Sequence, residues 1–155
     1  MDFKRDANTC LFKVRLTKTL EIKRVIAMRT YKGGCHCGAV KFEVEAAEEP
    51  EVSECNCSIC SKSGYLHLIV AKNTFHLLTG EDNLASYTFD THEAKHLFCK
   101  TCGIKSFYIP RSHPDGFSVN VRCLDDDIIK NINIEQFDGK NWEANMHKLK
   151  PLSNG

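Results

Sequence analysis

Hydrophobic and polar residues alternate over short segments of this chain, which is the pattern of half-buried β-strands. Single charged residues separate Val40, Phe42 and Val44, so these three side chains are expected on one face of a strand. Further short apolar runs follow, bounded by turn residues, and we predict a strand in each of them: residues 66–71, 75–78, 87–89, 104–109 and 117–121.

Short strands at close spacing, with glycine and proline between them, predict a mainly β fold of the sandwich or barrel type with little helix. Two segments are exceptions. The acidic residues 125–127 can cap a short helix that continues through Ile128 and Ile129. Residues 141–150, before Pro151, form a short helix or a loop.

Residues 1–30 differ from the remainder of the chain. They carry eight Lys or Arg and three acidic residues, and their apolar residues alternate loosely with the basic ones. This pattern fits an added strand, an amphipathic helix or a poorly ordered arm. We therefore divide the chain into a basic N-terminal extension, residues 1–30, and a single domain, residues 31–150.

Composition limits the classes of partner and the cellular compartments that we expect for this protein. The 155 residues carry a net charge of +1, so nothing pulls the whole chain toward nucleic acid or membrane. No apolar run reaches the length of about 18 residues that a membrane span needs. No signal-peptide pattern opens the chain, so we expect an intracellular protein of the cytoplasm, the nucleus or both.

Cysteines carry the strongest chemical signal. Of the nine, Cys10 and Cys123 stand alone, and the other seven form three tight clusters: Cys35 and Cys37; Cys55, Cys57 and Cys60; Cys99 and Cys102. In a reducing compartment, such spacing indicates metal binding or catalysis before disulfides.

The first and last clusters together offer four thiols. In an extended segment Cys35 and Cys37 project to one face, and Cys99 and Cys102 followed by Gly103 resemble a zinc-knuckle turn. These four predict a closed Cys₄ zinc site, although a different pairing of the clusters is stereochemically conceivable.

The middle cluster offers three thiols and leaves more alternatives open. Three ligands make an open metal site, whereas a histidine such as His67, His92 or His96 would complete a second closed site. A dithiol redox centre at Cys57 and Cys60 is a third alternative.

An open three-thiolate site favours a small-molecule thiol as its fourth ligand, because zinc lowers the pKa of a thiol that it binds. Lys62 and Lys72 are candidates to offset the negative charge or to meet a substrate carboxylate. Asn56, Ser61 and Ser63 are candidates to donate hydrogen bonds to the sulfurs.

Three segments, residues 33–40, 55–60 and 98–103, resemble the glutathione-dependent formaldehyde-activating enzyme family. Residues 87–92, 106–112 and 123–125 point more closely to its animal branch, the centromere protein V-like proteins. The resemblance spans roughly residues 31–145.

This resemblance implies an Mss4-like fold, in which zinc pins β-sheets arranged as a sandwich or tent. It implies two zinc ions per chain, and it implies a carbon–sulfur lyase or synthase that acts on a glutathione adduct such as S-(hydroxymethyl)glutathione. By the family's pattern, the structural zinc is held by Cys35, Cys37, Cys99 and Cys102, and the catalytic zinc by Cys55, Cys57 and Cys60.

The alternative function is a non-catalytic, zinc-stabilised binding module for chromatin, microtubules or another protein. The basic extension and the likeness to the animal branch motivate it, and nucleic acid or the cytoskeleton would then be the partner. The residues alone identify no general base, for which His67, His92 and His96 are the candidates.

Overall fold

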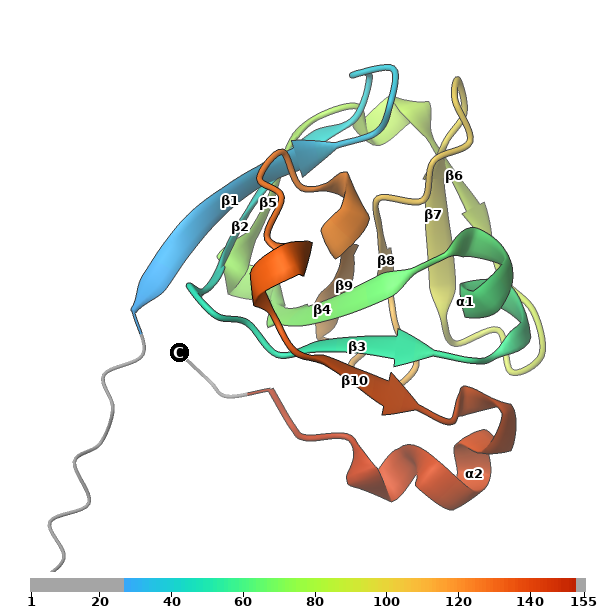
Figure 1. Cartoon of the computed structure of the whole chain (residues 1–155). Helices are drawn as coiled ribbons and strands as arrows, with labels where there is room; N and C mark the ends of the chain where they lie inside the picture. The colour runs from blue at the N-terminus through green and yellow to red at the C-terminus, as the bar shows by residue number, and fades with distance from the viewer. Residues whose placement is uncertain (1–26, 153–155) are drawn as a thin grey trace, which may run out of the picture.

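Ten β-strands form two sheets within residues 27–152, the part of the chain that the computed structural model describes (Figure 1). The smaller sheet is antiparallel, in the order β1 (Met28–Gly34), β2 (Lys41–Ala47), β5 (Phe75–Thr79). The larger sheet has the order β10 (Ile134–Phe137), β3 (Val52–Cys55), β4 (Leu66–Ala71), β9 (Gly116–Asn120), β8 (Phe107–Ile109), β7 (Lys95–Cys99), β6 (Leu84–Tyr87). β10 pairs with β3 in parallel, and the other pairs are antiparallel. The prediction of a mainly β fold is confirmed.

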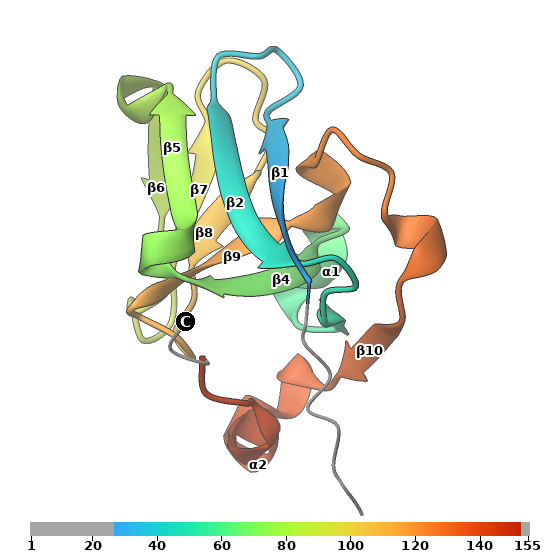
Figure 2. The same cartoon turned by 90° about the vertical axis from the view of Figure 1, so that its left-hand side faces the viewer.

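The core lies between the two sheets, and aromatic rings join them. Phe42 and Phe75 of the smaller sheet stack at 5.4 Å between centroids, and Phe75 also meets Phe107 of the larger sheet at 4.7 Å. Figure 2 shows the smaller sheet face-on, with β4 running across its lower end. The predicted alternation in β2 is confirmed, because Phe42 and Val44 are buried.

β1 pairs with β2 along its whole length, from Met28 opposite Ala47 to Gly34 opposite Lys41. Tyr31 anchors this strand: its ring is fully buried, and its hydroxyl donates to the carbonyl oxygens of Ala47 and Glu48. The strand therefore starts three residues before the expected domain boundary at residue 31. Residues 1–26, which hold most of the basic extension and Cys10, lie outside the described residues.

Some expected elements match the structure and others do not. The apolar runs at residues 66–71 and 75–78 are β4 and β5. The strand expected at residues 87–89 is wrong, since β6 ends at Tyr87, and only the last three residues of 104–109 form a strand.

The helix expected at residues 125–129 is also wrong. The backbone N–H of Asp125 donates to the carbonyl of Lys32, and Leu124 forms a β-bridge with Gly33. This pairing with β1 fixes the start of the acidic segment, which then bends at Asp125 and Asp126, and only a 3₁₀ turn follows it, at Ile129–Asn131.

Helices are short and lie at the ends of the larger sheet. α1 (Ser58–Ser63) follows β3, and α2 (Trp142–Asn145) follows β10 between two 3₁₀ turns, so the helical alternative for residues 141–150 is confirmed. The other 3₁₀ turns are Lys72–Thr74, Glu81–Asn83 and Val121–Cys123. No helix within residues 27–152 has the length and apolar character to cross a membrane.

Candidate metal centres

Four cysteines from distant parts of the chain meet at one end of the two sheets. Cys35 and Cys37 lie at the connection of β1 to β2, whereas Cys99 ends β7 and Cys102 lies in the turn after it. Their Sγ atoms all lie within 4.8 Å of one another, with 3.5 Å between Cys35 and Cys37 and 3.6 Å between Cys37 and Cys99. A metal ion held there would join the smaller sheet to the larger one.

Each half of this four-cysteine cluster is a tight turn with glycine in the left-handed region. Gly38 has φ 76° and Gly103 has φ 74°, conformations that residues with a Cβ adopt at a cost. Donors point at the sulfurs: the N–H of Val40 lies 3.3 Å from Cys35 Sγ, and the side-chain amide of Asn83 lies 3.1 Å from Cys99 Sγ.

The four thiols fit zinc. Four sulfurs at about 2.3 Å from a zinc ion in a tetrahedron lie about 3.8 Å apart, close to the distances between these sulfurs, whereas a disulfide would bring two sulfurs to about 2.05 Å. Backbone N–H groups, that of Cys102 first, lower the pKa of Cys99 to about 6, which favours the thiolate that zinc requires.

The second cluster comes from one short stretch of chain. Cys55 ends β3, Cys57 precedes α1, and Cys60 lies in the first turn of α1. Their three Sγ atoms lie within 4.8 Å of one another, and no other cysteine, histidine, aspartate or glutamate among residues 27–152 joins the group. The expectation of a histidine that completes this site is therefore wrong for the described part of the chain.

The three thiols influence one another's pKa values because they lie close together. The neighbouring Cys55 and then Cys60 lower the pKa of Cys57, whereas Cys55, Cys57 and burial raise the pKa of Cys60. Soft sulfur donors in this arrangement also fit zinc, with one coordination position left open.

The three-cysteine cluster lines a cavity of about 700 Å³. The other walls come from the loop after β6, the end of β8 and the segment from Phe137 through α2 to Leu149. None of the four cysteines of the first cluster lines this cavity. The three-cysteine cluster therefore faces a ligand-sized cavity, and the four-cysteine cluster does not.

Two histidines form part of the cavity wall. His67 Nδ1 lies 3.0 Å from the hydroxyl of Ser118, while its buried Nε2 has no hydrogen-bond partner among the described residues. Burial, and then the charge of Lys105, lower the pKa of His67 to about 3 and that of His96 to about 4. Both rings are therefore neutral near pH 7. His92 is exposed, hydrogen-bonded to Thr88, and does not line the cavity.

The expected partners of the sulfurs are only partly correct. Lys62 and Lys72 are exposed and do not line the cavity, while Asn56 and Ser63 hydrogen-bond elsewhere. Lys105, which the sequence reasoning missed, lies behind the wall: its Nζ is 2.9 Å from His96 Nδ1 and 4.2 Å above the ring of Tyr108.

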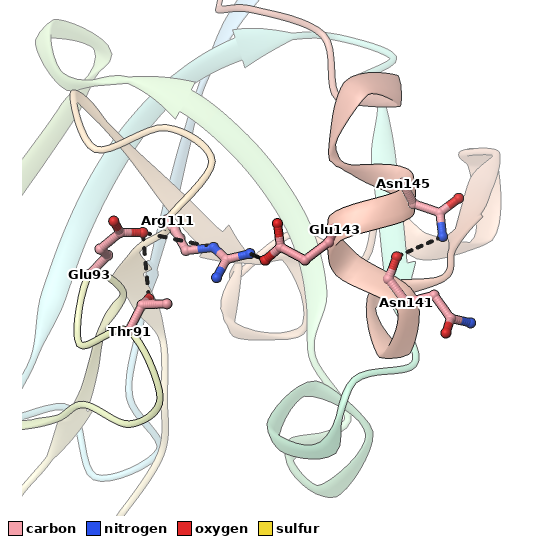
Figure 3. A network of polar contacts seen from close by, with 6 residues as sticks. All are labelled: Thr91, Glu93, Arg111, Asn141, Glu143 and Asn145. Carbon is pink, nitrogen blue, oxygen red and sulfur yellow. Dashed lines mark hydrogen bonds and ion pairs between the residues drawn. The ribbon is translucent and has the colours of Figure 1, made fainter.

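A second basic residue that sequence reasoning missed, Arg111, lies where β8 ends. Figure 3 shows its guanidinium between Glu93 of the neighbouring loop and Glu143 of α2. Arg111 and Glu143 both line the cavity. The network therefore connects two of the cavity's walls.

Comparison with known proteins agrees with this geometry. The family model described as glutathione-dependent formaldehyde-activating enzyme matches residues 30–140. A crystal structure of a Rhodobacter sphaeroides protein, determined as a structural-genomics target, is similar with a TM-score of 0.62 and 35% identity. The match covers 68% of this chain and 99% of that chain, and it confirms the Mss4-like fold class. The chain therefore belongs to the glutathione-dependent formaldehyde-activating enzyme family.

Proposed function

We propose that this protein is a zinc-dependent carbon–sulfur lyase or synthase acting on a glutathione adduct such as S-(hydroxymethyl)glutathione. Cys55, Cys57 and Cys60 hold the catalytic zinc, and the four-cysteine cluster holds a structural zinc. The observation that carries the proposal is that the three-cysteine cluster lines the cavity while the four-cysteine cluster does not. An incomplete ligand set facing a cavity is the arrangement of a catalytic zinc site.

Zinc, when bound, supplies a Lewis acid that holds the substrate sulfur as a thiolate and makes it a better leaving group. In the lyase direction the C–S bond breaks, its electron pair stays on sulfur, and the hydroxyl oxygen loses a proton as the carbonyl forms. Glutathione and formaldehyde are the products.

His67 is the candidate base that the cavity wall offers, with its ring fixed by Ser118 through Nδ1. Burial lowers the pKa of His67 to about 3, so the imidazole is neutral at pH 7 but a weak base. Its Nε2 has no partner among the described residues, yet this atom is buried, so the side chains around it must move before it meets the substrate hydroxyl. The proton that the hydroxyl loses ends on the glutathione sulfur, which balances the reaction.

Lys105 balances the charge of the cluster. Three thiolates exceed the charge of one zinc ion by one unit, and the positive charge of Lys105 is attracted by the cysteines, which raise its pKa against the effect of burial. We propose that this lysine, not Lys62 or Lys72, offsets the negative charge of the site.

Cobalt substitution tests the proposal. In the full chain loaded with two Co²⁺ ions, added glutathione should change the sulfur-to-metal absorption of one site only. Cys57→Ser should bind about one metal ion instead of two and lose the response to glutathione, because a hydroxyl is a poor ligand for a soft site.

Cys123→Ser is the matched control, since Cys123 belongs to neither cluster, and it should keep both metal ions and the response. The proposal is contradicted if the wild-type protein binds two metal ions, its absorption spectrum does not change when glutathione is added, and it does not change the rate of adduct exchange. That outcome favours the alternative, a zinc-stabilised module of the animal branch. Its basic extension lies mostly outside the described residues, and nothing in residues 27–152 favours it.

A further inference from the structure

Arg111 occupies an unusual position between two walls of the cavity. Its Nη2 donates to Glu143 Oε1 at 2.8 Å, and its Nε lies 3.8 Å from Glu93 Oε2, too far for a hydrogen bond. The guanidinium carbon also stacks 4.7 Å above the ring of Trp142. Arg111 is therefore held in place by an aromatic ring and by two carboxylates.

The two sides of this network differ in exposure. The side chain of Arg111 is only 20% exposed, whereas those of Glu143 and Glu93 are 80% and 62% exposed. The arginine is thus fixed beside the cavity, while its acidic partners are solvated and replaceable at little cost. An ion pair with one solvated carboxylate contributes little to stability, so Arg111 can exchange Glu143 for another carboxylate at low cost.

Unused donors surround the same point. A guanidinium has five N–H donors, and only one hydrogen bond from Arg111 is found among residues 27–152. The ring of Trp142, over which the guanidinium lies, also lines the cavity, whereas its indole Nε1 is buried and does not face the cavity. Arg111 therefore keeps N–H donors free for a carboxylate that enters the cavity.

We propose that Arg111, held on the ring of Trp142, binds a carboxylate of the thiol substrate, which takes the place of Glu143 at the guanidinium. A guanidinium pairs with a carboxylate through two parallel hydrogen bonds, which fixes orientation as well as position. This inference rests on the proposed function, because the thiol that binds at the three-cysteine cluster brings the carboxylate into the cavity. Glu143 then acts as an internal competitor that holds the arginine ready in the free protein.

The proposal makes opposite predictions for the two members of one ion pair. Arg111→Gln removes the anchor and should weaken binding of a carboxylate-bearing thiol, whereas Glu143→Gln removes the competitor and should strengthen it. A pair that only ties α2 to the neighbouring loop predicts that both substitutions weaken binding.

The experiment uses the full chain loaded with two Co²⁺ ions and follows the sulfur-to-cobalt absorption of the open site. Two ligands are compared: glutathione, and its diethyl ester, in which both carboxylates are blocked but the thiol is unchanged. The wild type should bind glutathione about tenfold or more tightly than the diester, in line with a charged hydrogen bond to a partly buried arginine. Arg111→Gln should remove this preference for glutathione without weakening the binding of the diester. Glu143→Gln should increase the preference.

Both variants are first required to bind two Co²⁺ ions, which shows that they are folded. Equal affinity of the wild type for the two ligands overturns the inference. So does an Arg111→Gln variant whose affinity for both ligands falls by the same factor. In each of those cases the spectrum still responds to the thiol, so the proposed function stands. A spectrum that responds to neither ligand overturns the proposed function itself.

Discussion

Lys105 shows how a single residue can be costly to the fold and useful to the site. Its ammonium lies 4.5 Å from the ring centroid of Tyr65 and 4.2 Å from that of Tyr108. Burial lowers its pKa to about 8, and only the nearby cysteines oppose this effect. A charged lysine in such surroundings destabilises the folded state unless the sulfurs carry negative charge.

We therefore expect Lys105→Met to be more stable than the wild type at pH 7, by up to about 3 kcal/mol. Lys105 binds its proton more weakly in the folded state than in the unfolded state, whose pKa is 10.5. The cost of burying the charge is complete below pH 8, decreases as the pH rises toward 10.5, and is absent above it. The difference in free energy of unfolding between variant and wild type should shrink over that range, measured by denaturant titration at equal metal content.

Lys62→Met, which changes an exposed lysine, is the control for this experiment. A stability difference for Lys105→Met that stays constant from pH 7 to 10.5 would show that titration of Lys105 plays no part. Reduced stability of the same variant at pH 7 would show that the aromatic contacts outweigh the cost of burial.

Residue by residue, the sequence indicated which cysteines cluster better than it indicated their surroundings. The spacing of Cys55, Cys57 and Cys60 has a chemical meaning within six residues of chain, and so it can be recognised before folding is known. Lys105 and Arg111 carry no such local pattern. Arg111 reaches the cavity, and Lys105 lies behind the cavity wall, only because β7, β8 and β9 pair in register, which is a tertiary effect.

At the scale of elements, the turn after Cys99 depends on one glycine. Gly103 has φ 74°, and a Cβ built there would meet nothing within 4 Å. Gly103→Ala should therefore lower the free energy of unfolding through backbone strain alone, by about 1 kcal/mol.

Gly103→Asn is the matched comparison, because asparagine tolerates the left-handed conformation better than alanine. It should recover part of the loss while introducing a larger side chain. Thermal or denaturant unfolding of the three proteins checks the order. If asparagine costs more than alanine, the strain argument fails and a steric conflict must replace it.

Elements were predictable where their pattern is local. The apolar runs of β4 and β5 stand out from their flanks, whereas β10 reads Ile-Glu-Gln-Phe and shows no clear alternation. It is a strand because its backbone pairs in parallel with β3, a contact between distant segments. The same kind of long-range pairing, with β1, kept residues 125–129 out of the helix that their acidic cap suggested.

At the scale of the whole molecule, the four-cysteine cluster acts at the junction of the two sheets. Each sheet contributes one pair of thiols, so a bound metal ion crosslinks segments that are more than 60 residues apart, as Cys37 and Cys99 are. The sequence suggested the four ligands but not that they come from different sheets. That arrangement emerges only from the strand order.

This arrangement predicts different consequences for losing each metal ion. Cys37→Ser changes an exposed thiol of the four-cysteine cluster, and Cys57→Ser changes a half-buried thiol of the three-cysteine cluster. Because only the first site joins the sheets, Cys37→Ser should lower the free energy of unfolding by about 3 kcal/mol or more, and Cys57→Ser by much less.

Hydrogen exchange locates the effect. In Cys37→Ser the amides of β1 and β2 should lose protection before those of β4 and β9, because the smaller sheet loses its crosslink while the larger one keeps its ladder. The aromatic contact of Phe75 with Phe107 still joins the sheets, so the variant should lose protection locally in the smaller sheet and remain folded as a whole. Equal loss of protection in both sheets, or equal destabilisation by the two substitutions, would mean that the four-cysteine site stabilises the molecule as a whole and not the joint between its sheets.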